Sequence, residues 1–300
     1  MIGSIRDHAE LGLVHHLLYN ARPDDPAGHA ETLRKFIQRE DIDTLDCCLP
    51  LNGDQSDLAE AVRNCGKSIC FAIHFYPLRT QPLAAKTPAE KAARDQLLLP
   101  LIDQAAAIGA GGFIFGAGTP SFNTADAEDF AAFDEFLDLL CPKLAGIGTD
   151  ALLEPFDYDV DKCFLFGPVE SCVELAERTL KRHRNFGFEL DMAHLPLMHE
   201  DFAASIRRLA PYLKRIHLGN CVATPGYERY GDTHPPMDFP NGSIGVQELV
   251  IILRSLLDVG FLVPGGKSGL VLEMTPYPGI SPEETAEKSF ALLDQAWKKV

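Results

Sequence analysis

A strict alternation of short apolar runs with longer segments of helical periodicity is the feature that most constrains how this chain can fold. The apolar runs have the length of β-strands and cover residues 11–18, 43–50, 68–75, 111–117, 150–156, 186–192, 214–219 and 269–275. The helical segments cover residues 28–39, 55–65, 88–107, 125–144, 167–183, 200–211, 245–259 and 281–298. Such alternation predicts parallel strands joined by right-handed crossovers. Eight units in 300 residues predict one α/β domain, residues 1–300, folded as a single (β/α)8 TIM barrel. A doubly wound open sheet is the alternative arrangement of the same elements.

Composition supports a large folded domain and argues against two kinds of partner. Hydrophobic residues make up 46% of the chain and charged residues 23%, which allows an extensive core and argues against disorder. The longest apolar runs are too short to span a bilayer, and residues 1–10 lack the apolar stretch of a signal peptide. We therefore expect a cytoplasmic protein that does not bind membranes. The net charge of −16 argues against nucleic acid as a partner, because phosphate backbones are bound mainly by lysine and arginine.

The eight cysteines fit neither a disulfide framework nor a zinc site. Cys47 and Cys48 are adjacent, and no Cys-x-x-Cys pair occurs anywhere in the sequence. In a long chain without a secretion signal, this pattern predicts reduced and mostly buried thiols.

Four polar residues interrupt apolar runs in the second half of the chain, each near the downstream end of a predicted strand. They are Glu154, Asp191, His217 and Glu273, here called the quartet. In a parallel barrel these strand ends meet at one face, where catalytic residues gather, so we expect the quartet to form one site. Its hard, oxygen-rich donor set favours a divalent cation, with Mn²⁺ expected first and Co²⁺, Mg²⁺ or Zn²⁺ as alternatives.

The quartet also suggests a chemistry. A divalent cation with open positions acts as a Lewis acid on a carbonyl or hydroxyl oxygen. A carboxylate at its edge can remove a proton from the carbon next to that carbonyl, and a second carboxylate can return it. For any one of the four residues, helix capping or backbone binding is the alternative, but their coincidence on four consecutive strands favours the metal site.

Two further residues lie close to Asp191 in the sequence. His194 follows it by three residues and is placed to contact a substrate oxygen or to support the metal ligands. A satisfied surface histidine is the alternative. Glu189 alternates with Asp191 and should share its face of the strand, where a buried carboxylate would need a partner. The sequence does not identify that partner.

Three histidines in the first half of the chain lie in predicted strands. His74 ends the predicted third strand, where it either lines the pocket and contacts substrate or packs in the core. His15 and His16 lie in the predicted first strand, whose alternation would send only one of them into the barrel. Packing in the core or at the surface is the favoured role for both.

Residues 220–244, here called the 220–244 segment, have no helical or strand periodicity. Long structureless segments in compact domains are usually functional, and this one follows the predicted seventh strand, so we expect a lid over the catalytic face. Asp232 and His234 can add metal ligands or hold substrate, and Arg229 can hold a sugar hydroxyl or a phosphate. An ordinary turn explains the same letters around Asp232, and a disordered insertion is the alternative for the whole segment.

These motifs resemble the xylose isomerase-like barrels, a superfamily that includes sugar isomerases, ketose 3-epimerases and endonuclease IV. The resemblance covers nearly the whole chain and rests on Leu153-Glu-Pro155, Asp191-x-x-His194, Ile216-His-Leu-Gly219 and Leu272-Glu273. In ketose 3-epimerases the residues matching the quartet bind Mn²⁺ or Co²⁺. The residues matching Glu154 and Glu273 form the catalytic acid/base pair, and the residue matching His194 contacts substrate. The resemblance therefore implies a metal-dependent sugar isomerase or epimerase with a carbohydrate substrate, and we expect a homo-oligomer.

A second resemblance keeps a different reaction open. Ile216-His-Leu-Gly-Asn-Cys-Val222 followed by Tyr230-Gly-Asp-x-His-Pro235 is similar to the barrel subunits of bacterial C-glycoside deglycosidases. Those enzymes cleave the carbon–carbon bond of 3-keto-C-glycosides by metal-assisted elimination and pair with a small second subunit. The alternative function is therefore a carbon–carbon lyase with such a partner.

Two other functions are weaker alternatives. Endonuclease IV has a three-zinc site, and Asp232-x-His234 resembles its lid pair, while His74 matches an early ligand. However, the predicted fourth strand ends in Phe115-Gly-Ala-Gly118, where that enzyme has another histidine, and the acidic net charge disagrees with DNA binding. A non-catalytic sugar-binding barrel is the other alternative, since a fold does not determine a function.

Overall fold

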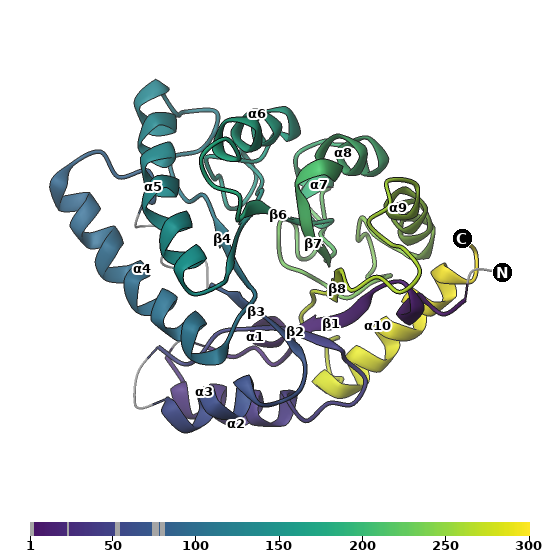
Figure 1. Cartoon of the computed structure of the whole chain (residues 1–300). Helices are drawn as coiled ribbons and strands as arrows, with labels where there is room; N and C mark the ends of the chain where they lie inside the picture. The colour runs from purple at the N-terminus through teal and green to yellow at the C-terminus, as the bar shows by residue number, and fades with distance from the viewer. Residues whose placement is uncertain (1–2, 23, 52–54, 74–77, 79–81) are drawn as a thin grey trace.

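The computed structural model describes residues 3–22, 24–51, 55–73, 78 and 82–300. Eight parallel strands pair in sequence order, and β8 pairs with β1, so the sheet closes into a barrel (Figure 1). The strands are β1 (Glu10–Val14), β2 (Thr44–Cys47), β3 (Ser68–Ala72), β4 (Gly112–Gly116), β5 (Asp150–Glu154), β6 (Phe186–Asp191), β7 (Leu213–Leu218) and β8 (Gly269–Leu272). The predicted (β/α)8 TIM barrel is confirmed.

Helices surround the strands on all sides (Figure 1). Those that alternate with the strands are α2 (Pro26–Phe36), α3 (Ser56–Arg63), α4 (Pro88–Ile108), α5 (Ala127–Gly146), α6 (Val169–Thr179), α8 (Phe202–Leu209), α9 (Val246–Asp258) and α10 (Pro282–Trp297). Shorter pieces are α1 (His15–Leu18), α7 (His194–Leu197) and the 3-10 turns η1 (Ile5–Asp7) and η3 (Ala210–Tyr212). In the described part of the chain, no helix combines the length and the apolar character needed to cross a membrane.

The first strand is shorter than predicted. β1 ends at Val14, and His15 and His16 begin the helix α1 instead of continuing the strand. The expectation that they lie in the first strand is therefore wrong, and strand alternation does not decide which of them is buried. Both imidazoles are buried. His15 packs against the rings of Tyr19 and Phe36, which is the core role that the sequence favoured. Successive side chains of a helix lie on neighbouring rather than opposite sides, so burial of one does not expose the next.

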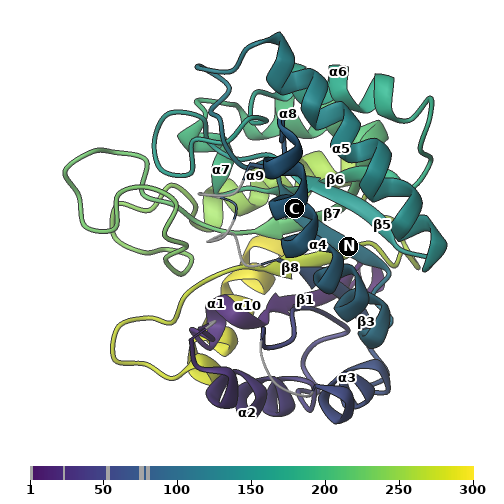
Figure 2. The ribbon, with the colours of Figure 1, turned by 90° about the vertical axis from the view of Figure 1, so that its left-hand side faces the viewer.

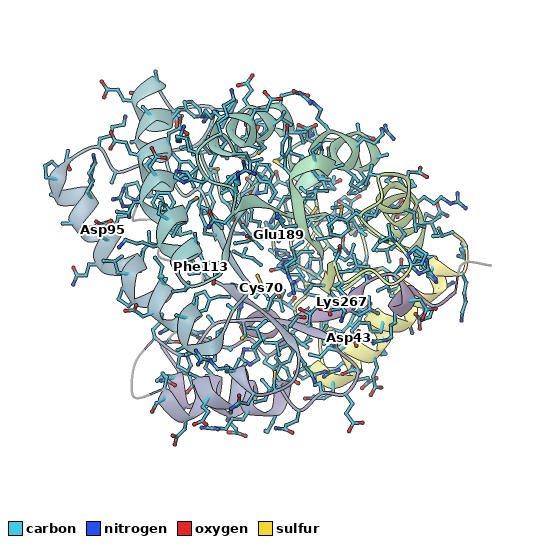
Figure 3. The ribbon with its side chains drawn as sticks, viewed as in Figure 1. Asp43, Cys70, Asp95, Phe113, Glu189 and Lys267 are labelled. Atoms are coloured by element: carbon cyan, nitrogen blue, oxygen red, sulfur yellow. The ribbon has the colours of Figure 1, made fainter. Side chains whose placement is uncertain are left out.

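The interior of the barrel is divided into an apolar and a polar part. The apolar part is a small cluster, separate from the main core, made by Cys70, Ala72, Ile114 and Leu152 of β3, β4 and β5. The polar part is buried and includes Asp46, Glu189, Arg215 and His217. Because Asp46 on β2 contacts Arg215 and His217 on β7, which is not its neighbour in the sheet, these contacts cross the barrel. Figure 3 shows Glu189 and Cys70 near the middle of the barrel and Asp95 at the periphery of the molecule.

A register shift between β6 and β7 places the polar residues opposite one another. Phe188 pairs with Leu213, but the next residue, Glu189, pairs with Arg215, so Lys214 is an extra residue in β7. Such a bulge changes the face that the following residues present. Leu213 therefore packs in the main core, whereas Arg215, two residues later, contacts Asp46 across the barrel.

The 220–244 segment connects β7 to α9 and forms neither helix nor extended strand. Its only bridges among the described residues join Val222 to Tyr230 and to Gly231. Figure 2 shows that the loops after β7 and β8 stand out from the barrel on the side where α1 and α7 lie. This is the side of the carboxyl ends of the strands, because α1 directly follows the end of β1.

The eight cysteines are free thiols, as predicted. Six are buried, and Cys65 and Cys163 are partly exposed. Burial raises the pKa of Cys48 and of Cys172 to about 12, which disfavours the thiolate that a cysteine nucleophile requires.

Candidate metal centre

The quartet comes together at the carboxyl end of the barrel. Glu154 and Asp191 are the last residues of β5 and β6, and His217 is the last but one of β7. Glu273 directly follows β8, and its backbone N–H still donates to the carbonyl of Leu218 at 3.2 Å, so it is held as if it belonged to the strand. All four side chains are buried. Strand pairing thus delivers the predicted residues to one place.

His217 lies between carboxyl groups on both sides of its ring. Its Nδ1 is 2.5 Å from Oε2 of Glu273, and its Nε2 is 2.6 Å from Oδ2 of Asp46. Oε1 of Glu189 accepts the backbone N–H of His217 at 3.0 Å and lies 3.6 Å from Nδ1. Burial acts to lower the pKa of His217, but Glu189 and Glu273 overcome it and raise the pKa well above its ordinary value.

Asp191 is fixed by backbone donors on one oxygen and unsatisfied on the other. Its Oδ1 accepts the N–H groups of Ala193 and Gly219, both at 2.9 Å. Its Oδ2 is buried and makes no hydrogen bond. Two imidazole nitrogens, Nε2 of His194 and Nδ1 of His234, each lie 3.6 Å away from it. One carboxylate oxygen is therefore positioned without a partner of its own.

His194 connects the quartet to the 220–244 segment. It begins α7, its Nε2 is 2.8 Å from Oε1 of Glu154, and its Nδ1 lies 3.6 Å from Oδ1 of Asp232. The same oxygen of Asp232 is 2.7 Å from Nε2 of His234. The structure thus places three predicted residues, His194, Asp232 and His234, directly beside the quartet.

Lys162 holds the 220–244 segment against the loop that follows β5. Its ammonium group is 2.5 Å from Oδ2 of Asp232 and also donates to the backbone carbonyl of that residue at 3.1 Å. The loop is in turn organised by Asp157, which accepts the backbone N–H groups of residues 160, 161 and 162. This contact is a partly buried ion pair between two segments that are distant in the sequence.

The two other predicted substrate contacts are placed differently. Arg229 donates to Oγ1 of Thr275 at 2.9 Å, and its guanidinium lies over the ring of Phe239. These contacts are with the loop after β8 and within the 220–244 segment, and its role in binding substrate stays a prediction. His74 lies outside the described residues.

Sequence reasoning missed Asp46 and Lys162 and left Glu189 without a partner. Asp46 interrupts the apolar run of β2 as the quartet interrupts later runs, so the same pattern was visible there. The contact of Asp46 with His217 spans 171 residues, and no spacing rule indicates it. Lys162 lies in a polar loop whose amino-acid composition is that of an ordinary turn, so nothing in the sequence distinguished it. The backbone N–H of His217 is the partner of Glu189.

Three carboxyl groups at this end of the barrel lack compensating charge. Burial, reinforced by the charges of Glu189 and Glu273, raises the pKa of Glu154 well above its ordinary value. Burial also raises the pKa of Glu189 and of Asp191, with the neighbouring carboxylates adding to the effect. A buried carboxyl group in this condition needs either a proton or a cation.

The acidic groups on the other side of the site are compensated. Burial acts to raise the pKa of Asp232, but His234, His194 and Lys162 hold it well below its ordinary value. Burial likewise opposes ionisation of Glu273, yet the imidazoles of His234 and His217 lower its pKa to about 2. The pKa of His234 is itself raised to about 10, because Asp232 and Glu273 outweigh the effect of burial. Positive charge is therefore missing mainly around Glu154 and Asp191.

The donor atoms are close enough to share an ion. Three groups of buried residues each offer one donor atom per residue, with all atoms of a group within 4.8 Å of one another. The groups are Glu154 with Asp191 and Glu273, Glu154 with Glu189 and His217, and Asp191 with His194 and His234. The unbonded oxygen of Asp191 and the uncompensated carboxyl groups fit a hard divalent cation held by the quartet.

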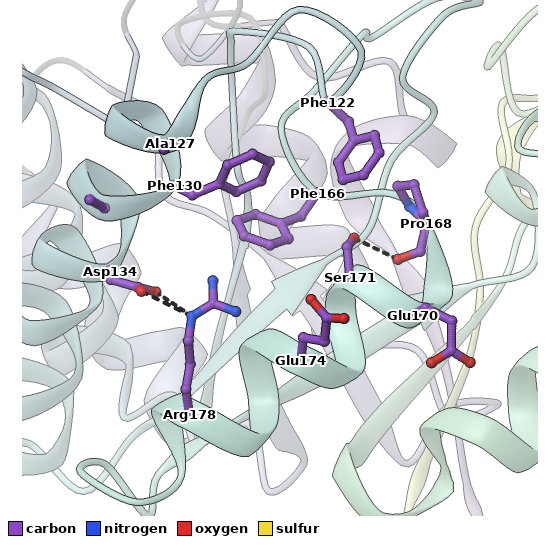
Figure 4. Close-up of a pocket in the computed structure, with 11 residues that line it drawn as sticks. Phe122, Ala127, Phe130, Asp134, Phe166, Pro168, Glu170, Ser171, Glu174 and Arg178 are labelled. Atoms are coloured by element: carbon purple, nitrogen blue, oxygen red, sulfur yellow. Dashed lines mark hydrogen bonds and ion pairs between the residues drawn. The ribbon is translucent and has the colours of Figure 1, made fainter.

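A separate hollow lies outside the barrel, between α5 and α6. It has a volume of about 660 Å³, and Figure 4 shows the rings of Phe122, Phe130 and Phe166 beside the Asp134–Arg178 ion pair. None of its lining residues belongs to the quartet or to the 220–244 segment. The chemistry of the chain is therefore concentrated at the barrel end rather than in this hollow.

The fold and this cluster define a (β/α)8 barrel with a buried carboxylate–imidazole centre at the carboxyl ends of its strands. No protein-family model matches the sequence, and no curated protein matches it. Among solved structures, a D-tagatose 3-epimerase-like protein matches with a TM-score of 0.69 and 14% identity, over 97% of this chain and 99% of that chain.

Other solved structures with this fold carry different activities. An AP endonuclease, family 2, from Brucella melitensis matches with a TM-score of 0.69 and 17% identity, over 94% of this chain and 98% of that one. The 3-keto-D-glucoside 4-epimerase YcjR from E. coli matches with a TM-score of 0.67 and 13% identity, over 96% and 99% of the two chains. At these identities the likenesses show that the chain shares the fold of these proteins.

Gly219 offers a test of the Asp191 position. A Cβ atom at this residue would lie 2.5 Å from Oδ1 and 2.6 Å from Oδ2 of Asp191, so Gly219→Ala must displace that carboxylate. We expect the affinity for Mn²⁺, measured by isothermal titration calorimetry, to fall about 10–100-fold, as when other supports of metal ligands are lost. Gly146→Ala is the matched control, because nothing lies within 4 Å of a Cβ atom there. Equal affinities in the two variants would show that Asp191 does not bind the metal.

Proposed function

We propose that this protein is a divalent-metal-dependent sugar isomerase or epimerase that removes a proton next to the carbonyl of a ketose or related keto-sugar. The observation that carries this proposal is that Glu154, Asp191 and Glu273 offer buried donor atoms within 4.8 Å of one another, and that one oxygen of Asp191 has no hydrogen bond. His217, the fourth member of the quartet, lies 2.5 Å from Glu273. A divalent cation bound there, Mn²⁺ before Co²⁺, Mg²⁺ or Zn²⁺, would polarise the carbonyl group of the substrate. The epimerase structures that share the fold support the same class of reaction.

Two carboxyl groups of different character are available for proton transfer. Neighbouring imidazoles keep Glu273 ionised, with its pKa lowered to about 2 despite burial, whereas burial raises the pKa of Glu154. A divalent cation bound beside Glu154 would favour its ionised form as well. We therefore assign Glu154, bonded to His194, and Glu273 together as the pair that removes the proton from the substrate carbon and returns it.

The remaining residues are assigned to substrate binding. His194 and His234 present ring nitrogens beside the quartet and are suited to hydroxyl groups of a sugar. Arg229 and His74 stay predicted contacts. The 220–244 segment supplies His234 and covers the site, and we assign it the role of a lid. The expected homo-oligomer and the cytoplasmic location also stay predictions.

Cleavage of keto-C-glycosides is the second candidate. The motif from Ile216 to Val222 and the Asp232–His234 pair, which motivated it, lie together in the structure because Gly231 bonds the carbonyl of Val222. Both reactions begin with proton loss beside a carbonyl, so the same glutamates would serve either. A lyase would in addition require the small second subunit as a partner.

DNA repair is disfavoured by two observations. The net charge of −16 opposes binding to a phosphate backbone. β4 ends at Gly116 and is followed by Ala117, where endonuclease IV would require another metal-binding histidine. The structural likeness to an AP endonuclease concerns the fold and does not supply the missing ligand.

Replacement of the two glutamates tests the catalytic assignment. Glu154→Gln and Glu273→Gln should lower kcat by about 10²–10⁴-fold, because each removes a positioned acid or base. His194→Ala should lower kcat less, since it removes a substrate contact and leaves both carboxyl groups. Initial rates on a keto-sugar, measured on variants loaded with Mn²⁺ to confirmed stoichiometry, separate loss of proton transfer from loss of metal. Near-wild-type turnover in both Gln variants would remove these residues from the proton-transfer step.

Hydrogen exchange tests the reaction class. Incubation with a panel of ketoses in D₂O should place deuterium on the carbon next to the carbonyl, as read by NMR or mass spectrometry. Treatment with a chelator should abolish the exchange, and Mn²⁺ or Co²⁺ should restore it. A 3-keto-C-glycoside assayed in parallel, with and without a candidate small subunit, would release its aglycone if the lyase assignment holds. Metal binding with neither exchange nor cleavage would instead favour a sugar-binding barrel.

The lid assignment can be tested at Lys162. Lys162→Met removes the ammonium group that holds Asp232, so the 220–244 segment should become more sensitive to proteolysis, with KM raised and kcat lowered together. Lys91→Met, which breaks an exposed ion pair with Glu135, is the matched control and should change neither quantity. Unchanged kinetics despite faster proteolysis of the segment would identify it as a passive loop.

A further inference from the structure

Asp46 is a buried carboxylate that the proposed reaction leaves without a role. It lies on β2 and is fully buried in the barrel. Arg215, from the opposite strand β7, donates to Oδ2 of Asp46 through Nε at 2.8 Å and to Oδ1 through Nη2. The same Nη2 donates to Oγ1 of Thr44 at 2.9 Å. The guanidinium thus binds Asp46 at both oxygens, which is the strong, planar mode of arginine–carboxylate pairing.

The protein makes specific room for this pair. A Cβ atom at Gly269 on β8 would lie 2.3 Å from one nitrogen of the Arg215 guanidinium, so a larger residue there would displace the guanidinium. The bulge at Lys214 turns Arg215 into the barrel, on the same side as His217 two residues later. The bulge in β7 and the glycine in β8 therefore both accommodate the contact between Arg215 and Asp46.

The Asp46–Arg215 pair determines which nitrogen of His217 carries a hydrogen. Oδ2 of Asp46, already an acceptor from Arg215, is 2.6 Å from Nε2 of His217. A carboxylate bound in this way has no proton to donate, so Nε2 must carry the hydrogen of this bond. The other ring nitrogen, Nδ1, faces only carboxylate oxygens, at 2.5 Å in Glu273 and 3.6 Å in Glu189. A lone pair on Nδ1 cannot face these oxygen lone pairs directly, so either a proton or a metal cation must lie between them, and a bound cation takes the place of the proton.

We propose that Asp46, fixed by Arg215, is a positioning residue that keeps the proton of His217 on Nε2 and so commits Nδ1 to the metal. This inference rests on the proposed function, because it names the support for one ligand of the same centre. A carboxylate on the outer nitrogen fixes both the tautomer and the orientation of a metal-binding imidazole, and its loss weakens metal binding about 10–100-fold.

The direct test is the protonation of His217 in the wild-type protein. The protein is labelled with ¹⁵N at histidine and loaded with Zn²⁺, which is diamagnetic, and two-bond ¹H–¹⁵N correlations identify the protonated and the metal-bound nitrogen of each ring. His217, assigned with a His217→Gln variant, should show a hydrogen on Nε2 and metal on Nδ1. Metal on Nε2 would overturn the inference whatever any variant does.

The role of Asp46 is tested by replacing the whole ion pair. Asp46→Leu with Arg215→Met exchanges the pair for apolar side chains, which buried pairs often tolerate, whereas removal of one partner alone would strand a buried charge. The double variant should fold, as judged by circular dichroism and its melting temperature, and bind Mn²⁺ about 10–100-fold more weakly. Asp134→Leu with Arg178→Met is the matched control, since that pair lies outside the barrel between α5 and α6.

The outcomes separate this inference from the proposed function. A folded double variant that binds Mn²⁺ as tightly as the control overturns the role of Asp46 and leaves the proposed function intact. Failure of the wild-type protein to bind any divalent cation overturns both. If the double variant does not fold, the labelled wild-type spectrum still decides whether Nδ1 or Nε2 binds the metal.

Discussion

The carboxyl groups of Asp46, Glu154, Glu189, Asp191 and Glu273 are all buried at one end of the barrel. Burial of charge is costly unless opposite charge is supplied, so this acidic cluster requires cationic groups or protons close to it. Side chains of the protein supply part of this positive charge. Arg215 compensates the negative charge of Asp46, and the imidazoles of His217 and His234 compensate that of Glu273. Glu154, Glu189 and Asp191 keep raised pKa values, which is the deficit that a divalent cation would fill.

Small departures from a regular barrel, namely one extra residue in β7 and two glycines, bring these acidic residues and their partners together. The extra residue Lys214 in β7 changes which side chains enter the interior and aligns Glu189 with Arg215 and Asp191 with His217. Glycine at 219 and 269 leaves space for the Asp191 carboxylate and the Arg215 guanidinium. The 220–244 segment places Asp232 and His234 beside the same end of the barrel, and the partly buried Lys162 contacts Asp232. Proton transfer beside a carbonyl is favoured by a water-poor enclosure of this kind, because electrostatic interactions are stronger there.

The parts of the structure that follow local rules were predictable from the sequence. Alternating strand and helix patterns predict the barrel, and the rule that parallel strands end at one face brings Glu154, Asp191, His217 and Glu273 together. What failed or was missed depends on local turns and on contacts across the barrel. His15 and His16 belong to a helical turn rather than to the strand whose apolar run they continue. Asp46 and Lys162 acquire their roles from partners 171 and 70 residues away, and no periodicity reports such distances.

The central claim is that the quartet holds one divalent cation, and the most direct measurement is a crystal structure of the Mn²⁺-soaked protein with anomalous diffraction at the manganese edge. The account predicts an anomalous peak about 2.0–2.2 Å from carboxylate oxygens of Glu154, Asp191 and Glu273 and from Nδ1 of His217. The absence of a peak there, or a peak only among Asp191, His194 and His234, would contradict it.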